Sequence, residues 1–146
     1  MRQRVFTYIT KKDQLLILDR TDANYTEPQV PGGTIKPGEP PEFAALREAK
    51  EETGLKVLQV VRLLGSFERN LLDIGRDESI IAWFFHLRTN EPTPPSWKHY
   101  EADPSEGIGP IEFQLYWVPI SKIPKLGGID CAMLQELKES VLHDVA

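Results

Sequence analysis

The sequence contains one cysteine among its 146 residues. A single cysteine excludes an internal disulfide and a cysteine-rich zinc site, so nothing in the sequence points to an oxidising compartment. We expect Cys131 to be a small buried apolar residue rather than a reactive thiol. No internal repeat is apparent, and the length fits one domain that can bury a core without further cross-links.

Long apolar runs and a surplus of positive charge are also lacking. No stretch approaches the ~18 apolar residues that indicate a membrane-spanning helix, and the N-terminus has no signal-peptide pattern. We therefore expect a soluble, cytoplasmic protein with no membrane partner. The net charge of −5 provides no wide basic surface for a duplex nucleic acid. An anionic ligand would need a cation to mediate its binding.

The pattern of apolar residues predicts an α/β domain. Alternating or continuous apolar runs predict strands at 5–10, 14–19, 58–67, 79–87 and 111–118, with a short strand at Gln29 and Val30. Good helix formers predict a helix over 41–53, and an apolar stripe predicts another over 129–143. The polar, proline-containing segment 89–110 is expected to be a long connection. Strands mixed with two helices indicate a layered fold with a mixed sheet.

Three glutamates crowd the predicted middle helix. With Glu48 at 0°, Glu51 falls near about −60° and Glu52 near about +40° on a helical wheel, so the three carboxylates share one side. Like charges at this spacing cost about 0.2–0.5 kcal/mol per pair on an exposed helix. Taken alone, the triplet would also fit a solvated acidic face that Arg47 and Lys50 help to neutralise.

The opposite side of this helix carries Phe43 and Leu46 with the stem of Lys50, and we expect that side to face the core. Ala44 and Ala45 lie beside the acidic side, where their small size would leave room for a ligand.

A glycine-rich loop precedes the acidic helix. Gly32 and Gly33 allow the backbone to pass close to a ligand, and Gly38 follows Pro37 in a second turn. The loop and the carboxylates together predict an oxygen-lined site for a hard divalent cation. Mg²⁺ suits such a site because it prefers oxygen ligands and often completes its shell with phosphate oxygens. The loop lacks the alternating acidic residues of a calcium-binding EF-hand.

The stretch from Gly33 to Leu55 resembles the Nudix box, written G-x5-E-x7-R-E-U-x-E-E-x-G-U, where U is a bulky aliphatic residue. The positions that match in register are Gly33, Glu39, Arg47, Glu48, Glu51, Glu52, Gly54 and Leu55. Seven fixed identities coincide by chance with a probability on the order of 10⁻⁹ per starting position. Two positions depart from the family pattern, because Ala49 is smaller than the usual aliphatic residue and Pro40 replaces a common helix cap.

The resemblance implies a Nudix-type α/β/α sandwich, as a single Nudix hydrolase domain over residues 1–146. It also implies a Mg²⁺-dependent pyrophosphohydrolase, with Mn²⁺ as a substitute. The substrate would be a small nucleotide in which a nucleoside diphosphate is linked to another group: a nucleoside triphosphate, a nucleotide sugar or a related compound.

Family roles transfer to matching positions. By resemblance, Glu48, Glu51, Glu52 and the carbonyl of Gly33 bind the metal, Arg47 orients the glutamates, and Glu39 supports the loop together with Gly32. A general base is also required, and the family places it variably. Glu101, Glu106 and Glu112 are candidates. We favour Glu112, since it begins a predicted strand after a long connection; a solvent-facing strand residue is the alternative.

The sequence says less about the substrate. The window from Asn70 to Asp73 lacks the proline of ADP-ribose types and the tyrosine of diadenosine polyphosphate types, so both preferences lose support. Further candidate contacts are Trp97, His99 and Tyr100 for a base, and Lys98, Arg20 and Arg69 for phosphates. Each of them also fits an ordinary surface role, and His86 is expected to be structural.

Two other readings stay open. A catalytically silent Nudix-type sensor would keep the fold and bind nucleotide without turnover. An acidic scaffold would instead bind a basic partner. The oligomeric state is left open, and a homodimer is compatible with the sequence.

Overall fold

A computed structural model describes residues 1–21, 26–101 and 111–144. Its elements in chain order are β1 (Arg2–Lys11), β2 (Gln14–Arg20), β3 (Gly32–Thr34), α1 (Pro41–Thr53), β4 (Gln59–Asn70), a 3₁₀ turn (Leu72–Ile74), β5 (Ser79–Arg88), β6 (Ser96–Glu101), β7 (Ile111–Pro119), a second 3₁₀ turn (Ile120–Lys122) and α2 (Leu134–His143). Among the described residues, no helix is long and apolar enough to cross a membrane.

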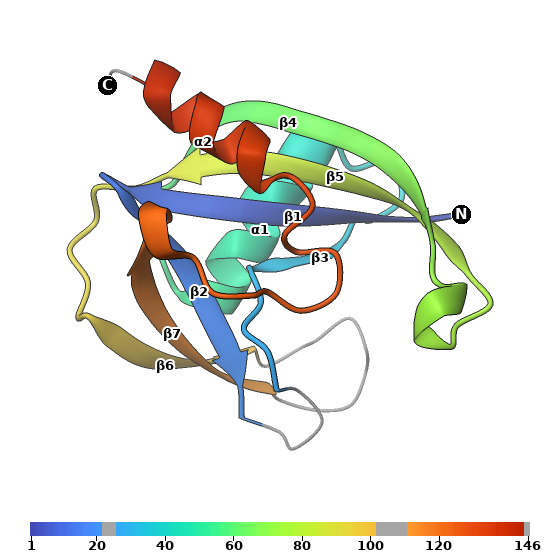
Figure 1. The fold of residues 1–146 in the computed structure, drawn as a ribbon, viewed down its shortest axis with the longest axis horizontal. Coiled ribbons are helices and arrows are strands. Elements are labelled where there is room, and N and C mark those ends of the chain that lie inside the picture. The colour runs from blue at the N-terminus through green and yellow to red at the C-terminus, as the bar shows by residue number, and fades with distance from the viewer. Residues whose placement is uncertain (22–25, 102–110, 145–146) are drawn as a thin grey trace.

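The seven strands form one mixed sheet in the order β4-β5-β1-β2-β7-β6, with β3 paired to β1. β1 and β5 run parallel, whereas the other paired strands run antiparallel. The two helices lie on opposite faces of the sheet (Figure 1). The predicted α/β layered fold with a mixed sheet is therefore confirmed.

Side chains of β1 alternate between two cores. Val5 and Ile9 pack in the core that includes the alanines of α1, while Phe6 and Tyr8 pack in the core that includes Leu137 of α2. This alternation follows from the two-residue period of a strand. The sheet is covered on both sides, and the functional residues lie where β1, β3 and α1 meet.

Several boundaries differ from the sequence prediction. The helix over 41–53 is confirmed, and Gly54 ends it in the left-handed region at φ 77°. The short strand lies at Gly32–Thr34 instead of at Gln29 and Val30; Gln29 only bridges to Leu18. α2 begins at Leu134, because residues 129–133 form turns. Cys131 lies in these turns and is exposed, so the prediction that it is buried was wrong.

Part of the predicted connection 89–110 is a strand. β6 (Ser96–Glu101) pairs antiparallel with β7 along its whole length. Its exposure alternates from residue to residue, with Trp97, His99 and Glu101 on the less exposed face. That alternation was present in the sequence but was hidden by the prolines before it and the polar residues after it. Residues 102–110, including the candidate base Glu106, lie outside the described residues.

The orientation of α1 is the main correction to the sequence analysis. The buried residues of α1 are Ala44, Ala45, Glu48, Ala49 and Thr53. Phe43, by contrast, keeps 60% of its surface exposed. Of the predicted apolar side, Leu46 packs against the core, whereas Phe43 and Lys50 are exposed, so the prediction is only partly right. The small alanines let the helix approach the sheet closely, and this approach carries two of the three glutamates inward.

His86 of β5, which was expected to be structural, is buried, and its ring lies between two hydroxyl groups. Its Nε2 lies 2.7 Å from Thr10 Oγ1, and its Nδ1 lies 2.7 Å from Ser140 Oγ. The pKa of His86 is lowered from 6.5 to about 4, mainly by burial; Asp144 opposes this shift, and Arg62 and Arg88 contribute to it. The neutral imidazole is thus the form that fits the fold.

This burial predicts a pH-dependent stability. Between pH 6.5 and 4 the unfolded chain binds more protons at His86 than the folded chain, so the free energy of unfolding should fall as the pH falls. Relative to His86→Gln, wild-type protein should lose on the order of 3 kcal/mol between pH 7 and pH 4. Urea unfolding of both proteins at the two pH values measures this loss. An unchanged difference between the proteins would contradict the assignment.

Candidate active site

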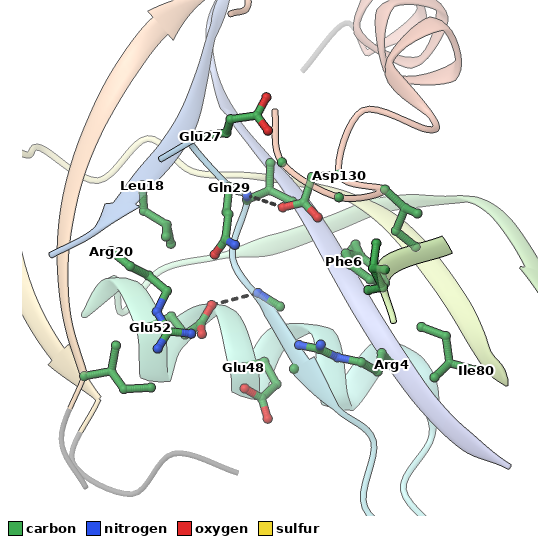
Figure 2. A pocket seen from close by; sticks show the side chains of 18 of the residues that line it. Arg4, Phe6, Leu18, Arg20, Glu27, Gln29, Glu48, Glu52, Ile80 and Asp130 are labelled. Carbon is green, nitrogen blue, oxygen red and sulfur yellow. Dashed lines mark hydrogen bonds between the residues drawn. The ribbon is translucent and has the colours of Figure 1, made fainter. Parts of the chain in front are cut away.

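A cavity of about 420 Å³ opens where β1, β3 and α1 meet the turn before α2. Figure 2 shows side chains from β1, β2 and α1 converging on it, with Glu48 and Glu52 below the backbone of β3 and Asp130 above. The lining is mixed, since arginines, carboxylates and apolar residues such as Phe6 all contribute. This composition suits a ligand that has both charged and apolar parts.

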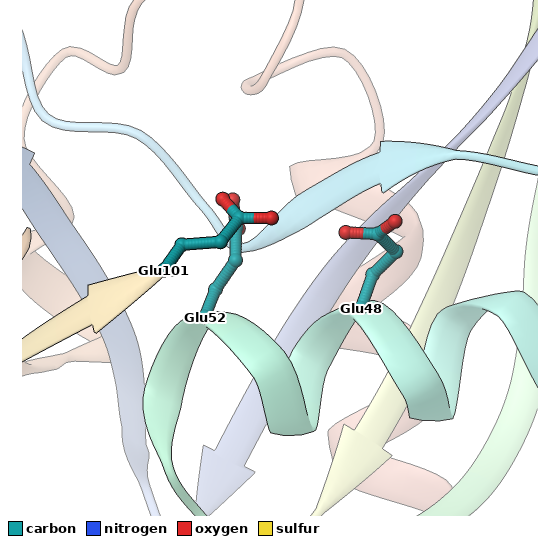
Figure 3. A group of neighbouring side chains, drawn as sticks. All are labelled: Glu48, Glu52 and Glu101. Carbon is teal, nitrogen blue, oxygen red and sulfur yellow. The ribbon is translucent and has the colours of Figure 1, made fainter. Parts of the chain in front are cut away.

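Three carboxylates gather at one wall of the cavity. One oxygen from each of Glu48, Glu52 and Glu101 lies within 4.8 Å of the others. Figure 3 shows the first two rising from successive turns of α1 and Glu101 reaching them from the end of β6. We call these three residues the carboxylate group. Glu48 and Glu101 are 4% and 8% exposed, so the group is largely withdrawn from solvent.

Glu101 reaches this position because β6 packs along the C-terminal end of α1. Trp97 Nε1 donates a hydrogen bond to the carbonyl of Thr53 at 2.9 Å, and His99 Nε2 donates to the carbonyl of Glu51 at 2.9 Å. Both acceptors belong to the last turn of α1, whose carbonyls lack partners within the helix. The next residue on the same face of β6 is Glu101, which therefore ends beside Glu52.

The two glycines of β3 make room for the carboxylate group. The N–H of Gly32 donates to Glu52 Oε1 at 2.8 Å. A Cβ atom on Gly33 would lie 2.2 Å from the carboxylate of Glu48, closer than real Cβ contacts allow. Only glycine at position 33 lets Glu48 lie against the backbone.

Arg47 ties the loop to the helix. Its guanidinium donates to both oxygens of Glu39 at 2.8 Å, to Glu48 Oε1 at 2.8 Å and to the carbonyl of Thr34 at 3.1 Å. Hydrogen bonds from Arg47 lower the pKa of Glu39 to about 2, and the N–H of Lys36 adds to this effect. Glu39 is therefore ionised at any working pH, and the loop is held by a charge-assisted pair.

Burial and mutual repulsion disfavour the ionised forms of Glu48 and Glu52 in the carboxylate group. Burial raises the pKa of Glu52 well above its usual value; Glu101 and Glu48 raise this pKa further, against the hydrogen bond from Gly32. Burial also raises the pKa of Glu48, although Arg47 opposes the shift. Oxygen-only donors at this spacing, with negative charge in excess, fit a hard divalent ion such as Mg²⁺ or Mn²⁺.

Some predicted site residues meet at the cavity. Those that line it are Gly32, Gly33, Glu48, Glu52, Arg20 and Arg69. Figure 2 shows Arg20 beside Glu52. Glu39 and Arg47 lie behind this wall, and they act through their contact with Glu48.

Other predicted residues lie elsewhere. The Glu51 side chain is 43% exposed and lies 3.5 Å from Arg47. The carboxylate of Glu112 accepts a hydrogen bond from the Tyr100 hydroxyl, and it is not among the described residues that line the cavity. Lys98 is 62% exposed and lies 3.9 Å from Glu112. The roles given to these residues, and to the packed Trp97, stay predictions.

Arg4 and Asp130 are among the cavity residues that the sequence analysis missed. Arg2, Arg4 and Phe6 lie on the same face of β1. The two-residue spacing of these arginines could have indicated a polar start to an otherwise apolar strand face. Asp130 lies in the turn before α2, where no sequence signal marks it. Its Oδ2 accepts the N–H of Val30 at 2.8 Å, and burial raises its pKa to about 7.

Comparison with known proteins gives matches over nearly the whole chain. A family model described as the NUDIX domain matches residues 1–137. A MutT NUDIX hydrolase from Burkholderia pseudomallei has a similar structure, with a TM-score of 0.68, 21% identity, and coverage of 93% of this chain and 97% of that one. The E. coli ORF135 protein is similar at a TM-score of 0.64 and 17% identity, over 100% of this chain and 94% of that one.

A UDP-X diphosphatase is also similar, at a TM-score of 0.70 and 18% identity. The alignment covers 97% of this chain but only 63% of the diphosphatase, so that protein is substantially longer. At these identities the structures establish a shared fold. The predicted Nudix-type α/β/α sandwich is thereby confirmed.

Proposed function

Because this chain belongs to the Nudix family of pyrophosphohydrolases, we propose that it is a Mg²⁺-dependent enzyme that cleaves the diphosphate linkage of a nucleoside diphosphate joined to another group. The domain would span residues 1–146, and Mn²⁺ would substitute for Mg²⁺. Two proteins of similar structure are named a UDP-X diphosphatase and an ADP compounds hydrolase, which is consistent with a nucleotide substrate.

The observation that carries the proposal is the carboxylate group. Three carboxylate oxygens within 4.8 Å of one another, on a wall of a cavity large enough for a nucleotide, are expensive to bury unless a cation joins them. Glu48 and Glu52 are the metal ligands that we assign first. Glu101 lies beside them. The Gly33 carbonyl and Glu51, at the exposed edge, are proposed to complete the set. When bound, the metal would neutralise charge on the diphosphate oxygens and favour ionisation of water.

The chain's own residues hold this arrangement in place. Arg47 fixes the carboxylate of Glu48 through a 2.8 Å hydrogen bond, and its pairing with Glu39 prevents the guanidinium from turning away. Gly32 fixes one oxygen of Glu52. Arg20, beside Glu52 on the cavity wall, is placed to contact a phosphate of the substrate.

The reaction adds water across the linkage, so a P–O bond to the water oxygen forms while the bridging P–O bond breaks. The attacking water must release a proton. We assign Glu101 as the acceptor, because its carboxylate belongs to the carboxylate group and lines the cavity. Glu112, the base favoured from the sequence, is the second candidate; it would have to leave the Tyr100 hydroxyl to reach the cavity.

A substrate panel tests the function. Purified protein with Mg²⁺, Mn²⁺ or EDTA should be given nucleoside triphosphates, nucleotide sugars, dinucleotides and 5′-triphosphorylated RNA. We expect metal-dependent hydrolysis of at least one compound. The nucleoside monophosphate, or the RNA 5′-monophosphate, should appear in an equimolar ratio with the other product, which is pyrophosphate from a triphosphate and a sugar phosphate from a nucleotide sugar. No metal-dependent hydrolysis of any compound would refute the enzyme, and nucleotide binding without turnover would then indicate the silent sensor.

A further inference from the structure

Arginines continue along the cavity beyond the carboxylate group. Arg4 and Arg2 follow one another on the cavity face of β1, and Arg69 of β4 lies across β5 from Arg2, since both pair with Ile80. Arg76, in the connection between β4 and β5, also lines the cavity. We call Arg2, Arg69 and Arg76 the arginine end of the cavity. Three separate segments of the chain build it.

Arg4 lies between the carboxylate group and the arginine end. Its charge favours the ionised forms of Glu48 and Glu52, so it lies close enough to interact with both. Figure 2 shows its guanidinium pointing into the cavity beside Glu48, and its Cζ lies 5.7 Å from the centroid of the Phe6 ring. Within the described part of the chain, the buried Nε of Arg4 has no hydrogen-bond partner. Arg4 therefore lines the cavity with its guanidinium while its Nε stays unpaired among the described residues.

The arginine end is held in shape by two carboxylates. Arg69 makes two hydrogen bonds to Asp73, at 2.9 and 2.7 Å, while Arg2 and Arg76 both pair with Glu78 at 3.2 and 3.3 Å. Two carboxylates thus orient the three guanidinium groups of the arginine end. Their side chains are 25–54% exposed, so a ligand can reach them.

The distance along β1 separates the arginine end of the cavity from the linkage that is cleaved. Arg2 lies two residues beyond Arg4 along a strand, a step of about 7 Å. Phosphates of a diphosphate held at the carboxylate group would meet Arg4 but would not extend to Arg69 and Arg76. A group that reaches those arginines must continue the substrate past the cleaved linkage, and the positive charge of the guanidinium groups favours a phosphate there.

Resting on the function proposed above, we propose that the arginine end binds a further phosphate of the substrate. The preferred substrates are then nucleotides whose phosphate chain continues past the cleaved linkage, with three or more phosphates, rather than nucleotide sugars that carry a neutral sugar. Arg4 bridges the two ends by contacting the phosphate between them. The arginine end determines specificity and takes no part in the chemical step.

Kinetics on matched substrates test this proposal. The kcat/KM of a nucleoside triphosphate and of a nucleotide sugar with the same base should be compared in wild type, Arg69→Gln and Arg76→Gln. We expect wild type to prefer the triphosphate, and each variant to lose about 10-fold on the triphosphate. The nucleotide sugar should change by less than about 2-fold, because its far group does not touch these arginines. Arg62→Gln, an exposed arginine on β4 away from the cavity, is the matched control.

The failure of this proposal is distinguishable from the failure of the function. Wild type that prefers nucleotide sugars, or variants that lose both substrates equally, would overturn the proposal while leaving the hydrolase intact. If wild type cleaves neither substrate, calorimetry with inorganic tripolyphosphate and Mg²⁺ tests phosphate binding directly. A Kd about 10-fold weaker for Arg76→Gln than for wild type would support the proposal. An unchanged Kd would overturn it. Arg76 is 54% exposed, so Arg76→Gln should fold, which circular dichroism checks.

Discussion

Replacing Glu52 by glutamine is expected to lower kcat by on the order of 10³-fold, because the carboxylate group would lose a charge that faces the metal and the diphosphate. Glutamine keeps an oxygen that can accept the Gly32 N–H, so the local backbone should hold. The stability of the metal-free protein should not fall, since burial and the neighbouring Glu101 and Glu48 all disfavour ionised Glu52. Steady-state kinetics and thermal melts measure the two effects.

Glu42→Gln is the matched control for this change. Glu42 lies in the first turn of the same helix and is exposed, so its replacement should leave kcat within about 2-fold. Glu52→Gln protein that keeps near wild-type kcat would remove Glu52 from the chemistry. A variant that fails to fold would instead show that this carboxylate is needed for structure.

Gly33→Ala is expected to have the second largest effect, through geometry rather than charge. The new methyl group would lie 2.2 Å from the Glu48 carboxylate, so that side chain must turn away and give up its hydrogen bond to Arg47. We expect kcat/KM to fall by on the order of 10²-fold, and the free energy of unfolding to fall by about 1–3 kcal/mol. Kinetics and urea unfolding provide both values.

Gly127→Ala is the control for Gly33→Ala, because it also replaces glycine by alanine but creates no steric clash. A Cβ atom at Gly127 would meet its nearest neighbour, the Cβ of Glu27, at 3.5 Å, an ordinary contact. Its free energy of unfolding should therefore change by less than about 1 kcal/mol. Equal destabilisation by the two alanines would mean that the contact between Gly33 and Glu48 is not what requires glycine.

Much of the fold could be predicted from the sequence, because its signals are local. The helix over 41–53 follows from helix-forming residues between Pro41 and Gly54, and the buried strands follow from apolar runs. The orientation of α1 could not be predicted correctly from the sequence. Hydrophobicity favoured the side of Phe43 and Leu46, but close packing of a helix on a sheet selected the small side chains of Ala44 and Ala49.

The candidate site could be predicted only in part, because some of its residues come from segments that are distant in the sequence. The spacing of Glu48 and Glu52 on one helix is a local property, so the sequence places them together. Glu101 joins them through the pairing of β6 with β7 and through two hydrogen bonds to the end of α1. The two hydrogen bonds join residues 44 and 48 positions apart, and a single sequence carries no direct signal for such contacts. Arg4 and Arg69 come together with the site by the same kind of long-range pairing.

The most direct test of the central claim is a crystal structure with Mn²⁺ and a nonhydrolysable nucleotide, in which anomalous scattering locates the metal. We expect an anomalous peak about 2 Å from carboxylate oxygens of Glu48 and Glu52, with phosphate oxygens of the nucleotide completing the shell. A nucleotide-bound metal at any other position, with these carboxylates left facing solvent or protein alone, would contradict the account.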